Sequence, residues 1–374
     1  MNKSILALGI ECSCDDTAIG LVKLSYNSQE KKIQNISSKI ISSHIFNQKD
    51  LHTEYGGVVP EIAARAHSNN LQICLEKTLA KAKISLEEIN VVCVTSGPGL
   101  IGGLISGINF AKGISFGLKK NLVGVNHLAG HALTPRLTND LQFPYLMLLA
   151  SGGHCQYLAV INHSTIKRLG TTIDDAPGEA FDKVAKLIGL KVYSGAEVES
   201  IAKNGDPNRF VFPLPLIKED NCNLSFSGLK SAVARAVEEL IKKQGGLYKK
   251  DQMDICASFQ KSIVEILSEK TKKAFKIFQK NFPEAKFSFS ISGGVAANLE
   301  IRKSQEKISK LHKTNFFAPP LSLCTDNGLM IAYAGGLRYL YGDYDDLDLA
   351  PKTRWPLDPE NQMTIGFGKK GRKV

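Results

Sequence analysis

The order of the expected elements repeats along the chain, and this repeat limits the folds open to it more than any other feature. Each part opens with two apolar segments joined by a polar turn: ILALGI, ECSCDDT and AIGLVKL first, then YLMLLA, SGGHCQ and YLAVI. Apolar runs on both sides of a polar turn predict a hairpin of buried strands. Each hairpin is followed by a third extended segment, at 32–43 and 164–173, and then by a helix, expected over 61–82 and 179–188.

Each part also closes in the same way, with an apolar strand, a glycine-rich turn and a helix. NVVCVTSGPG leads into LIGGLISGINFAKGI in the first part, and KFSFSISGG leads into VAANLEIRKSQEKI in the second. Three strands, a helix, a strand and a helix, in this order twice, are typical of a duplicated actin-like or ribonuclease-H-like fold. The sequence therefore predicts an α/β protein with two lobes and an active-site cleft between them, and 374 residues suit two lobes.

The repeat also sets the expected domain boundaries. The first lobe is predicted over 1–125, the second over 126–350, and a basic tail over 351–374. An insert at about 193–251 interrupts the second lobe and holds VFPLPL, SFSGLKSAV and a Gly-Gly pair, which favours a functional loop region. The tail ends in GFGKKGRKV and is expected to be mobile, with a weak contact to phosphate or none.

A long helix is expected after the insert, from about Met253 to Lys280, because apolar side chains recur there at helical spacing. Lysines mark its other side: Lys272, Lys273, Lys276 and Lys280. Such a run is typical of a solvated face, and contact with nucleic acid is the alternative.

The composition is that of an ordinary globular protein. Hydrophobic residues make up 43% of the chain and charged residues 22%, which excludes disordered, collagen-like and coiled-coil chains. A net charge of +11 favours a polyanionic partner such as nucleic acid or a nucleotide. AT-rich coding, which enriches Lys, Ile and Asn, would also give this charge.

The cysteines and the N-terminal segment indicate a cytoplasmic protein. Eight cysteines without a CxxC pair are expected to be reduced thiols, and MNKSILALGIEC lacks the features of a signal or transit peptide. The uncharged run from Val91 to Ala111 is long enough for a transmembrane helix. Because Gly97, Pro98 and Gly99 would break a helix there, we expect a strand, a loop and a helix of a soluble protein instead.

Three acidic residues lie in the first hairpin turn, ECSCDDT: Glu11, Asp15 and Asp16. In an actin-like fold this turn faces the phosphates of a nucleotide, and acids there can hold a metal ion or assist proton transfer. A solvated turn is the alternative.

Three glycine-rich turns stand at equivalent ends of the two parts. SGPGLIGG and SGGVAAN each follow a strand and open a helix, where backbone N–H groups bind anions, and SGGH covers Ser151 to His154. None matches a P-loop or a dinucleotide fingerprint. Together they favour a nucleotide held in the cleft between the lobes.

A pair of histidines has the spacing of a metal site. His127 and His131 in HLAGH are four residues apart, so on a helix both imidazoles lie on one face and can bind one ion. Leu128 stands where a zinc protease of the HExxH type has its general-base Glu, which argues against peptide hydrolysis. Asp326 in CTDNG is either a third ligand or the N-cap of the apolar helix that follows.

These motifs together resemble one known family across nearly the whole chain. The chain is similar to the tRNA N6-adenosine threonylcarbamoyltransferases of the TsaD type, once called glycoproteases. The resemblance rests on GIECSCDDTAI, YGGVVPEIAARAH, GPGLIGGLISG, HLAGH, LASGGH, GEAFDKVAKLIGL, SFSGLKSAV, SISGGVAAN, CTDNGLMIA and RWPL at Arg354–Leu357. It implies a two-lobed actin-like acyltransferase that passes a threonylcarbamoyl group from threonylcarbamoyl-AMP to N6 of adenosine 37, in tRNAs that read codons beginning with A.

The resemblance also implies site residues and partners. One divalent metal ion, with Fe²⁺ favoured and Zn²⁺ as the alternative, would be bound by His127, His131 and Asp326. Asp15 and Asp16 match an acidic pair that assists transfer. Substrate contacts would come from Leu149, Ala150, Ser151, Gly152, Gly153, Asp182, Gly195, Glu199 and Asn298. Implied partners are tRNA, a paralogous inactive subunit and a small P-loop ATPase, with no membrane.

The sequence departs from the family pattern in two places. Cys12 stands in the first turn where the family has Thr. The family's YPGGP segment appears here as VYSGAEVE, which keeps Gly195 but has Ser194 and Ala196 beside it.

Three other functions fit parts of the sequence. An ATP-dependent phosphotransferase of the same fold would explain the glycine turns and acids but leaves HLAGH without a role. A metalloprotease is disfavoured by the missing Glu, and a catalytically silent subunit is disfavoured by the His pair and Asp326.

Overall fold

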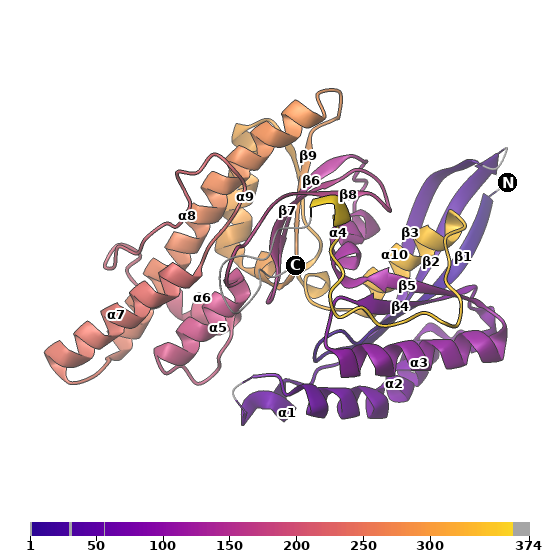
Figure 1. The fold of residues 1–374 in the computed structure, drawn as a ribbon, viewed down its shortest axis with the longest axis horizontal. Coiled ribbons are helices and arrows are strands. Elements are labelled where there is room, and N and C mark those ends of the chain that lie inside the picture. The colour runs from indigo at the N-terminus through magenta and orange to yellow at the C-terminus, as the bar shows by residue number, and fades with distance from the viewer. Residues whose placement is uncertain (1, 30–31, 56, 362–374) are drawn as a thin grey trace.

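The computed structural model describes residues 2–29, 32–55 and 57–361, and it contains two five-stranded sheets (Figure 1). In the first sheet the order is β3-β2-β1-β4-β5, and in the second it is β10-β9-β6-β7-β8. The first is built from β1 (Asn2–Glu11), β2 (Thr17–Gln29), β3 (Lys32–Phe46), β4 (Val91–Gly97) and β5 (Asn121–Asn126). The second is built from β6 (Tyr145–Ala150), β7 (Cys155–Val160), β8 (Ile166–Thr171), β9 (Ser288–Ser292) and β10 (Asn315–Phe317).

The two sheets have the same topology. In each, three antiparallel strands are followed by two strands that run parallel to the first, so β1 pairs with β2 and β4 as β6 pairs with β7 and β9. The parallel pairs are joined through helices, as crossover connections require. This confirms the predicted duplication of an α/β unit into two lobes.

Helices cover the outer face of each sheet. The first lobe has α1 (Lys49–Thr53), α2 (Pro60–Ala82) and α3 (Ile101–Leu118). The second has α5 (Pro177–Leu187), α6 (Gly195–Ala202), α7 (Ser227–Gln244), α8 (Lys249–Asn281) and α9 (Leu299–Leu311). Four short 3-10 helices complete the described chain: η1 (Leu86–Glu88), η2 (Gly294–Ala297), η3 (Leu321–Leu323) and η4 (Pro359–Asn361). The helices expected over 61–82, 179–188 and 253–280 therefore form, with small shifts at their ends.

Two helices form a central layer between the sheets. These are α4 (His127–Thr138) and α10 (Gly328–Leu340), which pack against each other. Although α10 closes the second repeat of elements, it lies against β1 and β2 of the first sheet, whereas α4, which follows β5 and closes the first repeat, contacts β6 and β9 (Figure 1). The approach is close, because a Cβ atom on Gly9 would lie 2.1 Å from the carbonyl oxygen of Gly328. Each half thus supplies a helix that covers the other.

The region expected to be an insert of loops contains helices. Within 193–251 the structure has α6 and α7, separated by an irregular stretch over 203–226. Leu229, Val233 and Val237 recur every fourth residue along α7 and are buried, which is the spacing that one helix face requires.

The lysines of α8 are partly engaged within the protein. The ammonium group of Lys273 donates to the carbonyl oxygens of Ile217 and Glu219, and Lys272 pairs with Glu269 at 2.5 Å. This part of the predicted solvated face therefore holds the irregular stretch that precedes α7.

Helix α3 is the one helix in the described ranges whose length and composition would allow it to cross a membrane. A third of that span is buried, and the helix packs against β4 and α2. The expected strand, loop and helix after Val91 are present as β4, a turn and α3.

After α10, the chain returns along both lobes as an extended segment. We call residues 343–358 the C-terminal strap. Its backbone bonds to the first lobe, with Asp345 N donating to Leu122 O at 2.8 Å and Lys352 N donating to Ser96 O at 2.7 Å. The carboxylate of Asp358 accepts from Arg168 N of β8 at 2.9 Å. The first residues of the expected tail are thus fixed to both lobes, and the tail residues 362–374 lie outside the described ranges.

Candidate metal centre and active-site cleft

The two histidines of HLAGH lie side by side on the first turns of α4. The side chain of Asn126 caps this helix by accepting from Leu128 N and Ala129 N, which fixes the helix start at His127. The rings of His127 and His131 are perpendicular, with centroids 4.8 Å apart, and both side chains are buried.

Asp326 completes the cluster from the turn before α10. Its Oδ1 lies 3.0 Å from Nε2 of His131 and 3.6 Å from Nε2 of His127. The N-cap of α10 is Asn327, whose side chain accepts from Met330 N, so the N-cap interpretation of Asp326 is wrong. Burial opposes ionisation of Asp326, but the two histidines hold its pKa well below the usual range.

The cluster has the chemistry of a divalent metal site. One ligand atom from each of the three residues lies within 4.8 Å of the other two. Burial alone would lower the pKa of His127, but the charges of Glu11 and Asp326 raise it to about 9, so the two carboxylates favour a positive charge between them. A cation is therefore stable at this place. Two imidazoles and one carboxylate suit Fe²⁺ or Zn²⁺ and leave positions open for substrate.

Glu11 is the residue that the sequence reasoning did not connect to this cluster. It ends β1 and is fully buried, and its Oε2 accepts from Nδ1 of His127 at 3.0 Å. Thr95 donates to the same oxygen, and Ser13 N donates to Oε1 at 2.6 Å. A carboxylate behind a metal-binding histidine fixes which ring nitrogen faces the ion. Residue spacing near Glu11 could not predict this contact, because Glu11 and His127 are far apart in the sequence.

A cleft of about 480 Å³ opens in front of the cluster, between the two lobes. It is lined by residues of the first hairpin turn, two glycine turns, the metal cluster and the strap: Ser13, Cys14, Asp15, Pro98, Gly99, Leu100, His127, Ser151, Gly152, Gly153, His154, Asp326, Thr353 and Arg354. The predicted cleft between lobes therefore exists, and the motifs expected at it converge there.

The acidic pair divides between two surroundings. Asp15 is among the described residues that line the cleft and Asp16 is not. Asp16 accepts a hydrogen bond from Nδ2 of Asn47 at 2.7 Å, and burial, together with the charge of Asp15, raises its pKa to about 7. Of the pair, Asp15 is therefore the acid that lines the cleft.

The remaining predicted contact residues lie in or behind an adjoining pocket of about 200 Å³, which shares Gly152 with the cleft. It is lined by Asp182, Gly195, Glu199 and Asn298, among others. Leu149 and Ala150 line neither space, since they are buried in β6 and support the turn that follows.

Two of these side chains already have partners within the protein. The side chain of Asn298 caps α9, accepting from Glu300 N and Ile301 N, and donates to Gln260. Glu199 accepts from Leu299 N at 2.8 Å. Both therefore shape the pocket as well as line it.

The three glycine turns differ in what their backbones face. In the first, Leu100 N donates to Ser13 O at 2.7 Å and Gly99 N donates to Thr353 O at 3.4 Å, so these donors are engaged. In the other two, a Cβ on Gly152, Gly153 or Gly294 would meet no atom within 4 Å. Space for an anionic ligand therefore lies at the second and third turns.

Comparison with known proteins identifies the family. Residues 39–333 match the family described as TsaD, tRNA N6-adenosine threonylcarbamoyltransferase. The chain belongs to this family. Proteins named tRNA N6-adenosine threonylcarbamoyltransferase from a Ruegeria species and from Ruegeria pomeroyi are each 50% identical to it over 374 residues, covering 100% of both chains. The protein of that name from Cereibacter sphaeroides is 48% identical over the same length.

Solved structures confirm the fold. HypF from T. kodakarensis superimposes with a TM-score of 0.54 at 15% identity, covering 90% of this chain and 48% of that chain. A structure of full-length HypF in the phosphate- and nucleotide-bound form gives the same score. The fold is thus the duplicated actin-like fold that the sequence predicts.

The segment that departs from the TsaD pattern keeps its place at the pocket. Ser194 serves as N-cap of α6, its Oγ accepting from Glu197 N at 3.3 Å. A Cβ on Gly195 would lie 3.5 Å from Phe181, an ordinary contact, and Glu199 still reaches α9. The changed residues thus begin a helix without removing Gly195 or Glu199 from the pocket.

Proposed function

We propose that this protein transfers the threonylcarbamoyl group of threonylcarbamoyl-AMP to N6 of adenosine 37 in tRNAs that read codons beginning with A. The observation that carries the proposal is the cluster of His127, His131 and Asp326, of which His127 and Asp326 line the cleft, in a chain that is a TsaD family member. The family supports an acyltransferase of tRNA modification, and the cleft supplies the chemistry that such a transfer needs.

We propose His127, His131 and Asp326 as ligands of one divalent metal ion, with Fe²⁺ favoured over Zn²⁺. When bound, the ion supplies Lewis-acid chemistry to substrate oxygens in the cleft. The part of the protein is to hold the three ligand atoms together, with Glu11 behind His127. The open backbone at Gly152, Gly153 and Gly294 offers room for the phosphate of the adenylate.

The transfer requires one bond to form and one to break. The N6 amine attacks the carbamoyl carbon, and the bond from that carbon to the phosphate oxygen breaks, so that AMP leaves with the electron pair. The amine loses a proton, and we assign Asp15 as its acceptor because Asp15 lines the cleft. Asp16, held by Asn47, is assigned the supporting position beside it.

We assign the adjoining pocket to the rest of the adenylate. Asp182, Gly195, Glu199 and Asn298 line this pocket, and it meets the cleft at Gly152. A ligand that spans both spaces places its ends on the two lobes. Positioning of this kind accelerates the transfer, because AMP is a good leaving group and the weak amine nucleophile chiefly needs to be oriented towards the carbamoyl carbon.

The proposed partners are tRNA, a paralogous inactive subunit and a small P-loop ATPase, and the proposed location is the cytoplasm. The net charge of +11 suits tRNA. The outer face of α2 and α3 carries exposed apolar side chains: Ile73, Ile101, Ile105 and Phe116, the last 74% exposed. We assign this apolar face to a protein partner, since exposed apolar patches of this kind mark interaction sites.

A single-turnover assay tests the function. Purified protein with its partners, labelled threonylcarbamoyl-AMP and unmodified tRNA is compared with His127→Ala and with His44→Ala, which changes a histidine of β3 outside the cleft. We expect modified nucleoside from the wild type and from His44→Ala, and a loss of at least 100-fold from His127→Ala. Transfer that survives His127→Ala in full would refute the role of the cluster. No transfer by the wild type, with sugar-dependent ATP hydrolysis in its place, would overturn the function.

A further inference from the structure

The C-terminal strap contributes Thr353 and Arg354 to the lining of the cleft. Three bonds fix it there: Lys352 N donates to Ser96 O at 2.7 Å, Gly99 N donates to Thr353 O, and Nδ2 of Asn126 donates to Trp355 O at 2.9 Å. Their partners are the end of β4, the first glycine turn and the cap of α4. The strap residues between these bonds are therefore held in register with the residues that build the cleft.

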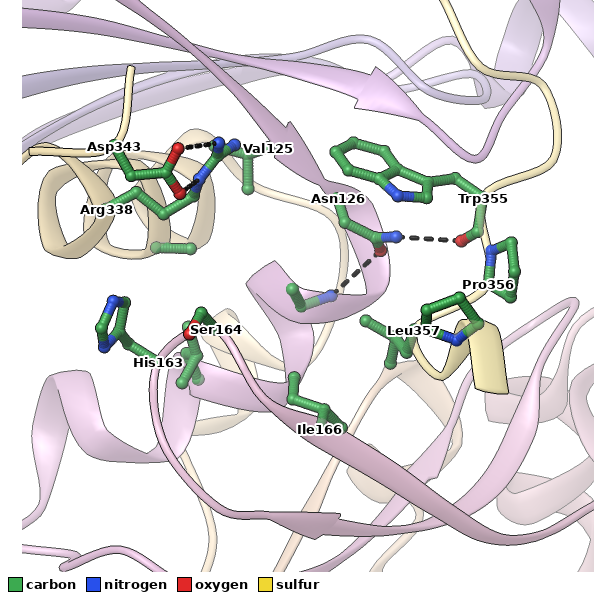
Figure 2. Close-up of a pocket in the computed structure, with 14 residues that line it drawn as sticks. Val125, Asn126, His163, Ser164, Ile166, Arg338, Asp343, Trp355, Pro356 and Leu357 are labelled. Atoms are coloured by element: carbon green, nitrogen blue, oxygen red, sulfur yellow. Dashed lines mark hydrogen bonds and ion pairs between the residues drawn. The ribbon is translucent and has the colours of Figure 1, made fainter. Parts of the chain in front are cut away.

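Consecutive side chains of the strap lie on opposite sides. Trp355 lines a separate pocket of about 420 Å³ beside α4, together with Pro356 and Leu357 (Figure 2). The ammonium group of Lys352 lies 4.4 Å from the centroid of the indole ring. Arg354, by contrast, lines the active-site cleft. Anchoring of Trp355 thus fixes where the Arg354 side chain starts.

Arg354 is exposed at the cleft and carries a free charge. Within the described ranges, its guanidinium group has no ion-pair or hydrogen-bond partner. Other arginines near the strap differ, since Arg338 pairs with Asp343 through two nitrogens (Figure 2). Without a protein partner, the five N–H donors of Arg354 are available to a ligand.

The charge balance of the cleft indicates which ligand. Asp15 and Asp326 line the cleft and repel an anion, and Arg354 adds a positive charge to that of a metal ion held at His127 and Asp326. Arg354 lines the same cleft as Gly152 and Gly153, whose backbones face open space. An arginine fork matches two phosphate oxygens, and backbone N–H groups can bind the others.

We propose that Arg354 is a phosphate-binding residue of the active-site cleft, acting on a phosphate of the substrates. The proposal rests on the proposed function, which brings two phosphates to this place: that of the adenylate, and those of the tRNA backbone near adenosine 37. Both have the same chemistry, and binding measurements separate them.

The test uses the zinc-loaded full chain and three variants. Arg354→Gln removes the charge, Arg354→Lys keeps the charge without the fork, and Lys23→Gln removes an exposed cation of β2 that does not line the cleft. Binding of AMP is compared with binding of adenosine by calorimetry, and binding of unmodified tRNA is measured over a series of salt concentrations. Thermal melting confirms that each variant is folded.

If the ligand is the adenylate phosphate, Arg354→Gln weakens the binding of AMP about 10-fold and leaves the binding of adenosine unchanged. Arg354→Lys then binds AMP with an affinity between those of the wild type and Arg354→Gln. If it is a tRNA phosphate, tRNA affinity falls and the slope of log affinity against log salt decreases by about 0.7 to 0.9, the amount expected for one contact. Unchanged AMP and tRNA binding in Arg354→Gln, or equal losses in Lys23→Gln, would overturn the proposal. Transfer by the wild type in the assay above tests the function separately, so either can fail alone.

Discussion

Replacing Glu11 by Gln tests whether the carboxylate behind His127 sets up the metal centre. Gln has nearly the same volume, so the change replaces one acceptor oxygen by a donor. Ser13 N can only donate, and it lies 2.6 Å from Oε1 of Glu11, so the amide oxygen of the substituted side chain must face it. The amide NH₂ group then faces Nδ1 of His127. Because NH₂ only donates, Nδ1 must accept, and the ring proton moves to Nε2.

The expected loss follows from that proton. Nε2 of His127 is the nitrogen that faces Asp326, at 3.6 Å, and a protonated nitrogen cannot bind a metal ion. Changes in groups that orient metal-binding histidines typically weaken metal affinity about 10- to 100-fold. This corresponds to about 1.4 to 2.7 kcal/mol, since each tenfold change is about 1.36 kcal/mol.

The assay is competition for Zn²⁺ between the protein and a chromophoric chelator, with the melting temperature of the metal-free protein measured alongside. Glu61→Gln is the matched control, because Glu61 is an exposed carboxylate of α2 that pairs with Arg65. Its zinc affinity is expected to equal that of the wild type. A folded Glu11→Gln variant that binds Zn²⁺ as tightly as the wild type would refute the reasoning.

Three further outcomes are expected. Gly9→Ala should destabilise the protein by about 1 to 3 kcal/mol in urea unfolding, because the added Cβ meets the backbone of Gly328. Gly113→Ala, on the open face of α3, is the control and should be neutral or stabilising. Equal effects of the two substitutions would contradict the close packing at Gly9. In the metal-free protein, Asp16 has a pKa of about 7 when folded against 3.8 as its ordinary value, so its contribution to stability is full below pH 3.8 and is lost as pH rises through 7. The free energy of unfolding of the wild type relative to Asp16→Asn should therefore fall over that range, and a flat difference would exclude the raised pKa. Phe116→Glu should abolish binding of the paralogous subunit in size-exclusion chromatography without changing the melting temperature, and an intact complex would place the interface elsewhere.

Much of the fold could be predicted because it depends on short-range patterns. Alternating or continuous apolar runs ended by Gly or polar turns define the strands, and the second occurrence of the same order defines the duplication. The insert was harder, because the stretch around VFPLPL and SFSGLKSAV mixes loop and helix signals. The burial of Val233 and Val237 against the second lobe decides in favour of α7.

The same difference between short-range and long-range contacts decides which site residues could be predicted. His127 and His131 could be paired from sequence, because a helix brings residues four apart onto one face. Asp326 lies 195 positions from His131, and only the fold shows that it reaches the pair rather than capping α10. Glu11 and Arg354 could not be assigned in this way, since their roles depend on a strand end and a strap that meet the cleft from distant parts of the chain.

The exchange of α4 and α10 between the two repeats determines how the protein unfolds. Met330 of α10 packs in one core with Ala7 and Leu24 of the first sheet and with Met147 of the second. If either repeat unfolded, the other would lose the apolar helix that covers its sheet, and that face of the sheet would be exposed to water. The two lobes therefore share a single stability, and heat or denaturant should melt them together in one transition.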